Sequence, residues 1–210
     1  MTRGDKKPTG LQTLGMTGTK WDFFVAAIDL FAAKGYTNVS IRDIAKTLNI
    51  KAASMYNHFA NKDALLQQIY EFCHINYEAA LPNLDNLIKL IPTTPPQEIL
   101  KQLTIPFKRK SQNLVTKCMQ IILEEMDRDK RAAKLADRIF VDVPNSYVKT
   151  VLLSMAEQGK IEPIDIDAFI ILYASFDIYA VSTSHSKFSL SLEDWLQGHE
   201  FLFSIIKAKD

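Results

Sequence analysis

Small and polar side chains gather in one stretch of the chain, SIRDIAKTLNIKAASMYNHFANK, residues 40–62. Its lysine and asparagine side chains supply hydrogen-bond donors and acceptors, and its small residues let a backbone approach a partner closely. Base edges and phosphates of DNA are recognised by these groups. The stretch therefore favours noncovalent recognition of a nucleic acid over bond-making chemistry.

Residue patterns of common enzymes are absent from the sequence, including HExxH, GxSxG and the glycine-rich phosphate loops. A small helical enzyme could use Asp177, His74 or Glu78 as acid–base groups, and this second hypothesis rests on those residues alone. His74 and Glu78 lie four residues apart, as metal ligands on a helix do, but no third ligand is evident. Cys73 and Cys118 show no metal spacing. We therefore expect no catalytic residue, no metal and no cofactor.

Two short helical segments must position the polar stretch. The first opens with Ser40 and Asp43, which match a capping box, and stops at Asn49, a residue that tolerates left-handed backbone. The second spans residues 51–59. Segments this short are unstable alone, so they must share a core with the preceding helix, which ends at Gly35. The side chains predicted to form that core are Trp21, Phe24, Val25, Ile28, Phe31, Ile41, Ile44, Leu48, Met55 and Phe59.

This pattern predicts a helix-turn-helix on a supporting helix. A nine-residue helix is about 13 Å long, comparable with the roughly 12 Å width of the DNA major groove. The outward positions of the second helix are small or polar, so only its tip needs to enter the groove. Asn61 caps the next helix, with Asp63 in its first turn.

Charge is unevenly distributed along the chain. Residues 1–62 contain nine Lys or Arg and four Asp, a net charge of +5, whereas the whole chain carries +1. A basic front part is typical of a phosphate-binding module, and a solvated basic face is the alternative. Arg3, Lys6 and Lys7 could form an arm that reaches a minor groove, or simply belong to a flexible tail.

The whole chain predicts an all-α protein. Its 210 residues and 47% hydrophobic content suffice to bury a core, and apolar residues recur at helical spacing. We predict a flexible tail over residues 1–18, a helix-turn-helix domain over 19–66 and a helical bundle over 67–210. Helices in the later part are predicted at residues 97–110, 111–127, 130–142, 144–158, 165–184 and 192–207, with Pro144 in the first turn of one of them.

No membrane or export signal is evident in the sequence. Its first ten residues, MTRGDKKPTG, contain no apolar core of a signal peptide. The most apolar run, Ala168–Val181, is too short for a membrane span and contains Asp177. With two unpaired-looking cysteines, these features predict a cytoplasmic protein without a membrane partner.

Residues Phe31 to Leu66 resemble the N-terminal domain of the tetracycline-repressor (TetR) family. The family pattern has an aromatic residue, glycine and a second aromatic, then Ser or Thr opening a helix, Ile-Ala, a tight turn, and Tyr-x-His-Phe-x-x-Lys. The matching residues here are Phe31, Gly35, Tyr36, Ser40, Ile44, Ala45, Tyr56, His58, Phe59 and Lys62. Two positions depart from the pattern, because Leu48-Asn49 replaces Ala-Gly in the turn and Ala53 replaces a glycine.

The resemblance implies roles for residues of the polar stretch. It implies phosphate contacts for Ser40, Ser54, Tyr56, His58 and Lys62, and base contacts for Arg42, Lys51, Ala52 and Asn57. Ala53 would add a methyl group near the DNA. Three plainer roles stay open: Tyr56 as core, His58 as a packing residue and Arg42 as a solvated charge.

The bundle is expected to hold an effector pocket and a dimer interface, as the resemblance implies. Candidate pocket residues are Phe72, Tyr77, Met119, Tyr147, Phe176 and Asp177. Each could equally be core, and Asp177 is favoured to meet a polar group at a dimer seam or within the chain, because an unpaired buried carboxylate is costly. Candidate interface residues are Tyr173, Ile178, Val181, Trp195, Leu196, Leu202, Phe203 and Ile206. A monomer that buries these faces internally is the alternative.

The leading hypothesis is a dimeric transcriptional regulator, most typically a repressor in the family, that binds a palindromic DNA operator and is released by a small-molecule effector. The alternative is a helix-turn-helix DNA-binding protein whose body binds another protein and senses no small molecule.

Overall fold

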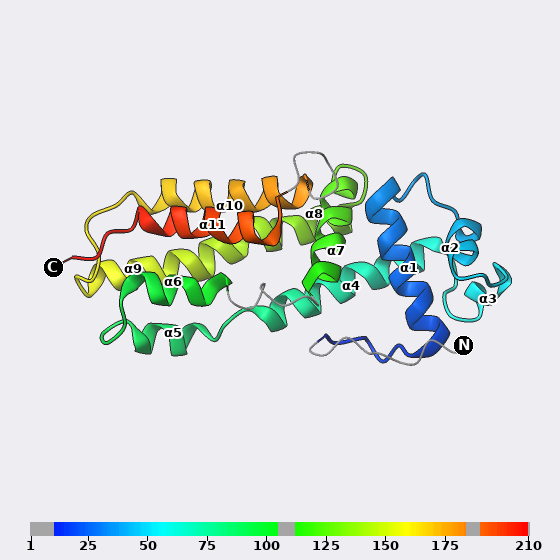
Figure 1. The fold of residues 1–210 in the computed structure, drawn as a ribbon, viewed down its shortest axis with the longest axis horizontal. Coiled ribbons are helices and arrows are strands. Elements are labelled where there is room, and N and C mark those ends of the chain that lie inside the picture. Colours follow the sequence, from blue (N-terminus) through cyan, green and yellow to red (C-terminus); the bar gives the residue numbers. More distant parts are fainter. Residues whose placement is uncertain (1–10, 105–111, 184–189, 210) are drawn as a thin grey trace. The chain divides into compact units, whose positions relative to one another are not determined.

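The computed structural model describes residues 11–104, 112–183 and 190–209, and the chain folds as two compact units (Figure 1). Unit 1 comprises Met1–Ala79 and Lys110–Leu135, and unit 2 comprises Ala80–Arg109 and Ala136–Asp210. Over the described residues the fold is helical, apart from loops and one isolated antiparallel bridge between Ile161 and Ala208. The all-α prediction is confirmed.

Unit 1 is built around a long first helix. Its helices are α1 (Gly18–Lys34), α2 (Ile41–Thr47), α3 (Ala53–Tyr56), α4 (Lys62–Ala80), α7 (Gln112–Glu125) and most of α8 (Lys130–Asp137). α1 packs on α2 and α7, and α2 and α3 follow at its side (Figure 1). The largest side chains of this core are Phe23, Phe24, Ile28, Phe31, Met55, Leu65 and Phe72, each at most 2% exposed. Their burial stabilises α2 and α3, which are too short to persist alone.

The predicted start and end of α2 and the predicted cap of α4 are confirmed. Asp43 N–H donates to the Ser40 hydroxyl over 3.2 Å, and Ser40 N–H donates to the Asp43 carboxylate over 2.8 Å, which completes the capping box. Asn49 adopts a φ of 57° after α2. Ala64 N–H donates to the Asn61 side chain over 2.7 Å at the start of α4. These helix ends can be predicted from the sequence because each depends on residues at most four positions apart.

α3 is shorter than the predicted segment of residues 51–59. Only Ala53–Tyr56 is α-helical. The turns on either side are closed by bonds across three residues, from Ser54 N–H to the Lys51 carbonyl at 2.9 Å and from His58 N–H to the Met55 carbonyl at 2.8 Å. Such tighter turns are common where a helix is too short to propagate.

Residues 11–17 fall in the predicted flexible tail but make defined contacts with α4. Gln12 N–H donates to the Asn76 side-chain oxygen over 2.7 Å, and the Asn76 amide donates back to the Gln12 carbonyl over 3.0 Å. Asn76 is buried and Met16 is 1% exposed. The Asn76 side chain bonds both the N–H and the carbonyl of Gln12, as a paired backbone peptide would. This pair of bonds anchors the segment on α4. Residues 1–10, with Arg3, Lys6 and Lys7, lie outside the described residues.

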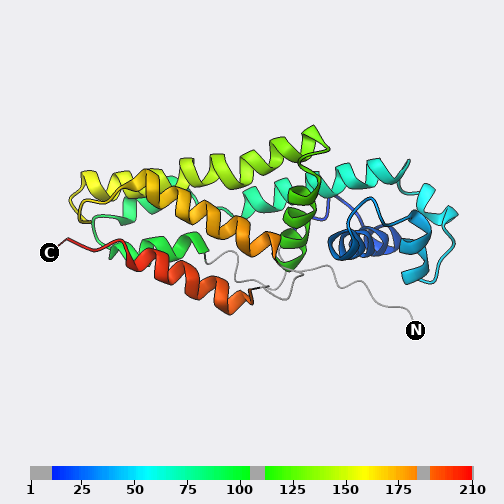
Figure 2. The same cartoon turned by 90° about the horizontal axis from the view of Figure 1, so that it is seen from above.

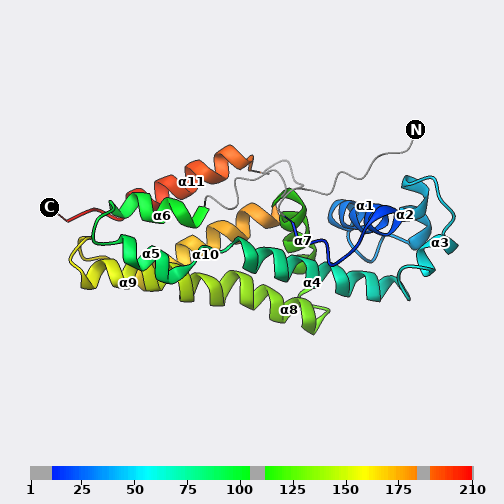
Figure 3. The ribbon, with the colours of Figure 1, turned by 90° about the horizontal axis from the view of Figure 1, so that it is seen from below.

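Unit 2 contains the remaining helices. They are α5 (Leu84–Leu90), α6 (Pro96–Thr104), the π-helical segments η2 (Arg138–Asp142) and η3 (Pro144–Val148), α9 (Lys149–Glu157), α10 (Ile166–Ser182) and α11 (Leu192–Ser204). α10 lies beside α9 and α11, and α6 packs on α11 (Figures 2 and 3). Side chains of all five α-helices meet in one core, including Leu87, Leu100, Leu152, Phe169 and Phe203.

The break predicted between residues 142 and 144 is wrong. The backbone stays helical from α8 through η2 and η3 into α9, and Figure 2 shows this run, green to yellow, without interruption. Val143 N–H bonds the Arg138 carbonyl and Lys149 N–H bonds the Pro144 carbonyl, both five residues back. The wider π turn accommodates Pro144, which has no N–H and would clash with a carbonyl in a normal α turn.

Candidate nucleic-acid interface

The polar stretch presents an exposed aromatic side chain next to buried ones. Tyr56 at the end of α3 is 59% exposed, whereas Met55 is fully buried and Phe59 is 2% exposed. Phe59 meets Phe23 of α1 with ring centroids 6.1 Å apart. Met55 and Phe59 therefore anchor α3 to the core, and Tyr56 is not a core residue.

The predicted DNA-contacting residues all retain solvent-accessible surface. Ser40, Arg42, Lys51, Ala53, Tyr56 and Asn57 are exposed, and Ala52, Ser54, His58 and Lys62 are half-buried. The tip of the helix-turn-helix is thus open to a partner. Whether each residue contacts DNA stays a prediction.

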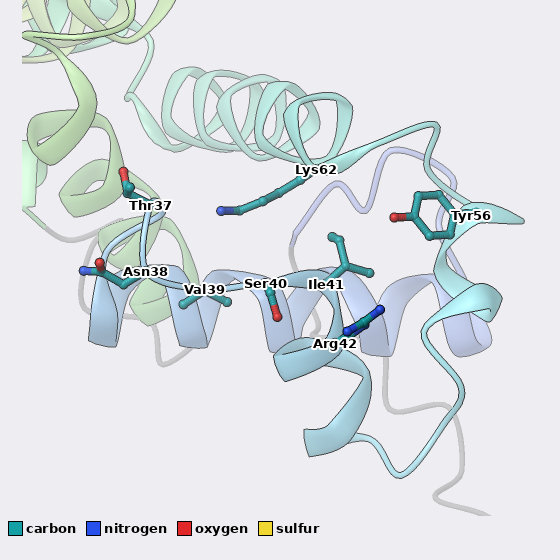
Figure 4. Close-up of a pocket in the computed structure, with 8 residues that line it drawn as sticks. All are labelled: Thr37, Asn38, Val39, Ser40, Ile41, Arg42, Tyr56 and Lys62. Carbon is teal, nitrogen blue, oxygen red and sulfur yellow. The ribbon is translucent and has the colours of Figure 1, made fainter.

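Four of these residues line one open hollow of about 520 Å³, shown in Figure 4. Ser40 and Arg42 come from the start of α2, Tyr56 from α3 and Lys62 from the start of α4. The hollow is completed by Thr37, Asn38, Val39 and Ile41. It brings together hydroxyl, guanidinium and ammonium groups, the donors that bind phosphate oxygens.

Lys62 is partly engaged inside the unit. Its ammonium donates to the Tyr36 carbonyl over 2.5 Å and lies 4.0 Å from the Tyr36 ring centroid. Burial lowers the pKa of Lys62, and the nearby carboxylates of Glu125 and Asp43 oppose that shift. The side chain therefore ties the start of α4 to the turn before α2, which the sequence comparison with the family pattern did not suggest.

The Ser40 hydroxyl is likewise used within the fold. It donates to the Asp43 carboxylate over 2.6 Å while accepting from Asp43 N–H. This hydrogen bonding lowers the pKa of Asp43. A phosphate contact by Ser40 would share the hydroxyl with the cap.

A charged cluster at the start of α4 was missed by sequence reasoning. Arg131 of α8 pairs with Asp63 at 2.6 Å and with Asp129 at 2.7 Å. Hydrogen bonding from Arg131 lowers the pKa of both carboxyls. The sequence predicts for Asp63 only a place in the first turn of a helix, because a partner 68 residues away leaves no local signal.

The predicted effector-pocket residues divide between the units. Phe72, Tyr77 and Met119 are buried in unit 1, and Tyr147, Phe176 and Asp177 belong to unit 2. Asp177 accepts a hydrogen bond from the Trp195 indole over 3.0 Å and lies 3.2 Å from Nε2 of buried His199. Of the two arrangements expected for Asp177, a dimer seam or an internal hydrogen bond, the internal bond is observed. A ligand role for the set stays a prediction.

Most of the predicted interface residues are buried within unit 2. Tyr173, Val181, Leu202, Phe203 and Ile206 are at most 9% exposed, Trp195 and Leu196 are half-buried, and Ile178 is 38% exposed. Both faces of α10 are apolar, so helical spacing alone does not decide which face is buried. A dimer role for the predicted set stays a prediction. The large apolar side chains that are exposed on α10 are Ile171, Leu172, Ile178 and Tyr179, and on α11 Phe201 and Ile205.

Part of the chain matches a known protein family. Residues 23–69 match the family model of bacterial regulatory proteins, tetR family. Residues 23–69 form a TetR-family domain. The biofilm operon icaADBC HTH-type negative transcriptional regulator IcaR of Staphylococcus aureus (strain Newman) is 47% identical over 47 residues, which is 22% of this chain and 25% of the relative. IcaR of Staphylococcus epidermidis is 45% identical over 51 residues, 24% and 27% of the two chains. The match thus spans about a quarter of the curated relatives.

Solved structures resemble this chain in fold over most of its length. A transcriptional regulator from Saccharomonospora viridis, solved in complex with choline, covers 91% of this chain and 98% of its own with a TM-score of 0.64 at 18% identity. The ketosteroid transcriptional regulator KstR2 of Mycobacterium tuberculosis covers 90% and 95% with a TM-score of 0.62 at 21% identity. At these identities the likeness concerns the fold. The family and these neighbours are transcriptional regulators, not enzymes.

Proposed function

We propose that this protein is a DNA-binding transcriptional regulator of the repressor type, which binds a palindromic operator as a homodimer and is released by a small-molecule effector. The observation that carries the proposal is the open hollow lined by Ser40, Arg42, Tyr56 and Lys62, which lies beside the exposed tip of a TetR-family domain. Such donors bind phosphates and hold a helix-turn-helix in register.

A homodimer is supported by the exposed stripe of α10. Ile171, Leu172, Ile178 and Tyr179 are 38–65% exposed and fall on one helical face. Large contiguous apolar surface on a helix calls for a partner. Two heads related by a two-fold axis would read two half-sites of a palindrome.

The effector part of the proposal draws on a structural neighbour. The neighbour from Saccharomonospora viridis was solved with choline, so choline is a reasonable first probe. A small molecule acts only if it binds one state of the regulator better than the other. A cytoplasmic location follows from the proposed target. None of the helices that the structure describes has the length and apolar content that a membrane crossing needs.

The test is selection of binding sites from random duplex DNA, followed by titration of the selected site at several salt concentrations. We expect an inverted repeat, a steep salt dependence and a stoichiometry of two chains per site. Replacing Lys51 or Asn57 by alanine should relax the preference at defined base pairs, by about 1–3 kcal/mol per contact. Absence of any sequence preference at low salt would refute the proposal.

A further inference from the structure

The corner between α7 and α8 reaches the first turn of α4 through one arginine. Arg131 donates from Nη1 and Nη2 to the two carboxylate oxygens of Asp63, at 3.1 and 2.6 Å. Its Nε and Nη2 also hold both oxygens of Asp129, at 2.7–3.1 Å. The guanidinium lies 5.8 Å from the Tyr70 ring centroid of α4. All of these residues belong to unit 1.

Asp63 is the neighbour of Lys62, so the contact has a structural continuation. Lys62 holds the Tyr36 carbonyl, and the turn that follows Tyr36 leads to Ser40, the cap of α2. A chain of polar contacts therefore runs from α8 through the first turn of α4 to the turn before α2. The hollow lined by Lys62, Ser40 and Tyr56 lies at its end (Figure 4).

The geometry of the cluster suits positioning better than stabilisation. The side chains of Arg131 and Asp63 are 42% and 58% exposed, and isolated pairs this open contribute little to folding. A planar guanidinium shared in two bidentate pairs nevertheless fixes the orientation of both carboxylates. The cluster can thus set where α4 begins without adding much to overall stability.

We propose that Arg131 is a positioning residue for DNA binding. Through Asp63 it fixes the first turn of α4, and with it the Lys62 contact that shapes the hollow, while Arg131 itself touches no DNA. The inference rests on the proposed function. α8 carries Arg131 and continues as helical backbone into η2 and unit 2. The contact between Arg131 and Asp63 is therefore linked to unit 2 through the chain itself.

The Asp63→Asn variant separates positioning from simple charge. Removing a carboxylate near a polyanion should tighten DNA binding if charge alone matters. Loss of the Arg131 contact should instead weaken binding, by about fivefold. Arg131→Gln should weaken binding to a similar extent, and the double variant should be no weaker than either single one, because both remove the same contact.

The controls come from the same corner of the chain. Asp127→Asn removes one negative charge and Arg128→Gln one positive charge, as the two test variants do, and both side chains are exposed. The Arg128 guanidinium donates to the Glu124 carbonyl and does not belong to the Arg131 cluster. Both controls should bind operator as the unaltered protein does. The melting temperature of every variant, measured by circular dichroism, should stay within about 3 °C, as expected for exposed ion pairs.

Three results would overturn the inference. Asp63→Asn could bind as tightly as the unaltered protein or more tightly, the two substitutions could act additively, or Arg131→Gln could lower the salt slope by about one contact, which would make Arg131 a phosphate ligand. If the unaltered protein shows no sequence preference, the proposed function fails and the inference with it. If it binds its operator and the variants match it, the inference alone fails.

Discussion

Two aromatic residues, one at the end of α3 and one just after it, have opposite surroundings. Tyr56 lines the hollow and is 59% exposed, whereas Phe59, three positions on, is 2% exposed beside Phe23. A buried aromatic contributes to folding through the apolar area it removes from water. An exposed one contributes to the surface that a partner meets. At the scale of single residues, recognition and stability are therefore separable in this domain.

Replacing Tyr56 and Phe59 in turn by alanine tests that separation. Tyr56→Ala should weaken operator binding by about tenfold, equivalent to one lost contact of about 1.4 kcal/mol, and leave the melting temperature unchanged. Phe59→Ala should destabilise the domain by about 3–5 kcal/mol. Fluorescence anisotropy with labelled operator and urea unfolding measure the two effects. Equal stability losses for both variants would contradict the assignment.

The carboxyls around Arg131 predict a particular acid response. The pKa values of Asp63 and Asp129 lie below the ordinary value of 3.8 because Arg131 hydrogen-bonds the ionised forms. Their contribution to stability is thus complete above that value and is lost as pH falls through the lowered pKa values. Melting temperatures between about pH 5 and pH 2.5 should fall less steeply in Arg131→Gln than in the unaltered protein. Parallel curves would contradict this.

At the scale of elements, the turn between α2 and α3 depends on one backbone conformation. Asn49 has a φ of 57°, where most side chains are strained and glycine is not. Asn49→Ala should destabilise the domain by about 1 kcal/mol, and Asn49→Gly should be close to neutral. Urea unfolding of the three proteins measures this. A glycine variant less stable than the alanine variant would contradict this account of the turn.

α10 and α11 approach each other closely at Gly198. A Cβ atom there would lie 2.2 Å from Cζ of Phe176. Gly198→Ala should therefore force the two helices apart and destabilise unit 2 by about 1–3 kcal/mol. Adding Phe176→Leu should recover part of the loss, which denaturant unfolding can measure. A Gly198→Ala protein of unchanged stability would mean that the Phe176 ring moves aside freely.

At the scale of the whole molecule, one apolar face of α10 is exposed among the residues that the structure describes. Leu172 at 54% exposed lies within the stripe of α10 that we propose as the homodimer interface. Leu172→Glu should convert the dimer to a monomer and weaken operator binding about a hundredfold or more, since both half-sites are then no longer held together. Light scattering after size exclusion measures the mass.

Leu153 provides the matched control for that experiment. It is 43% exposed and belongs to α9, so it is not part of the α10 stripe. Leu153→Glu should leave the mass and the affinity unchanged. A monomeric unaltered protein, or a dimer that survives Leu172→Glu, would refute this interface.

The helix caps and the turn of the helix-turn-helix could be predicted from the sequence because they depend on residues close together in the chain. The capping box at Ser40, the left-handed Asn49 and the cap at Asn61 each involve residues within one turn, so they could be predicted and are observed. The divide at residue 66 between predicted domains falls inside α4. The compact units divide elsewhere, after residues 79, 109 and 135. That predicted division remains untested as a functional boundary.

What the sequence determined by itself was helix periodicity, the helix-turn-helix and the small polar tip, because these depend on spacing along the chain. The tertiary structure alone decided which apolar face of α10 is buried, that Pro144 sits within a continuous helical run, and that Arg131 meets Asp63. Each of these depends on how segments far apart in sequence pack together. A single sequence carries no local record of those contacts.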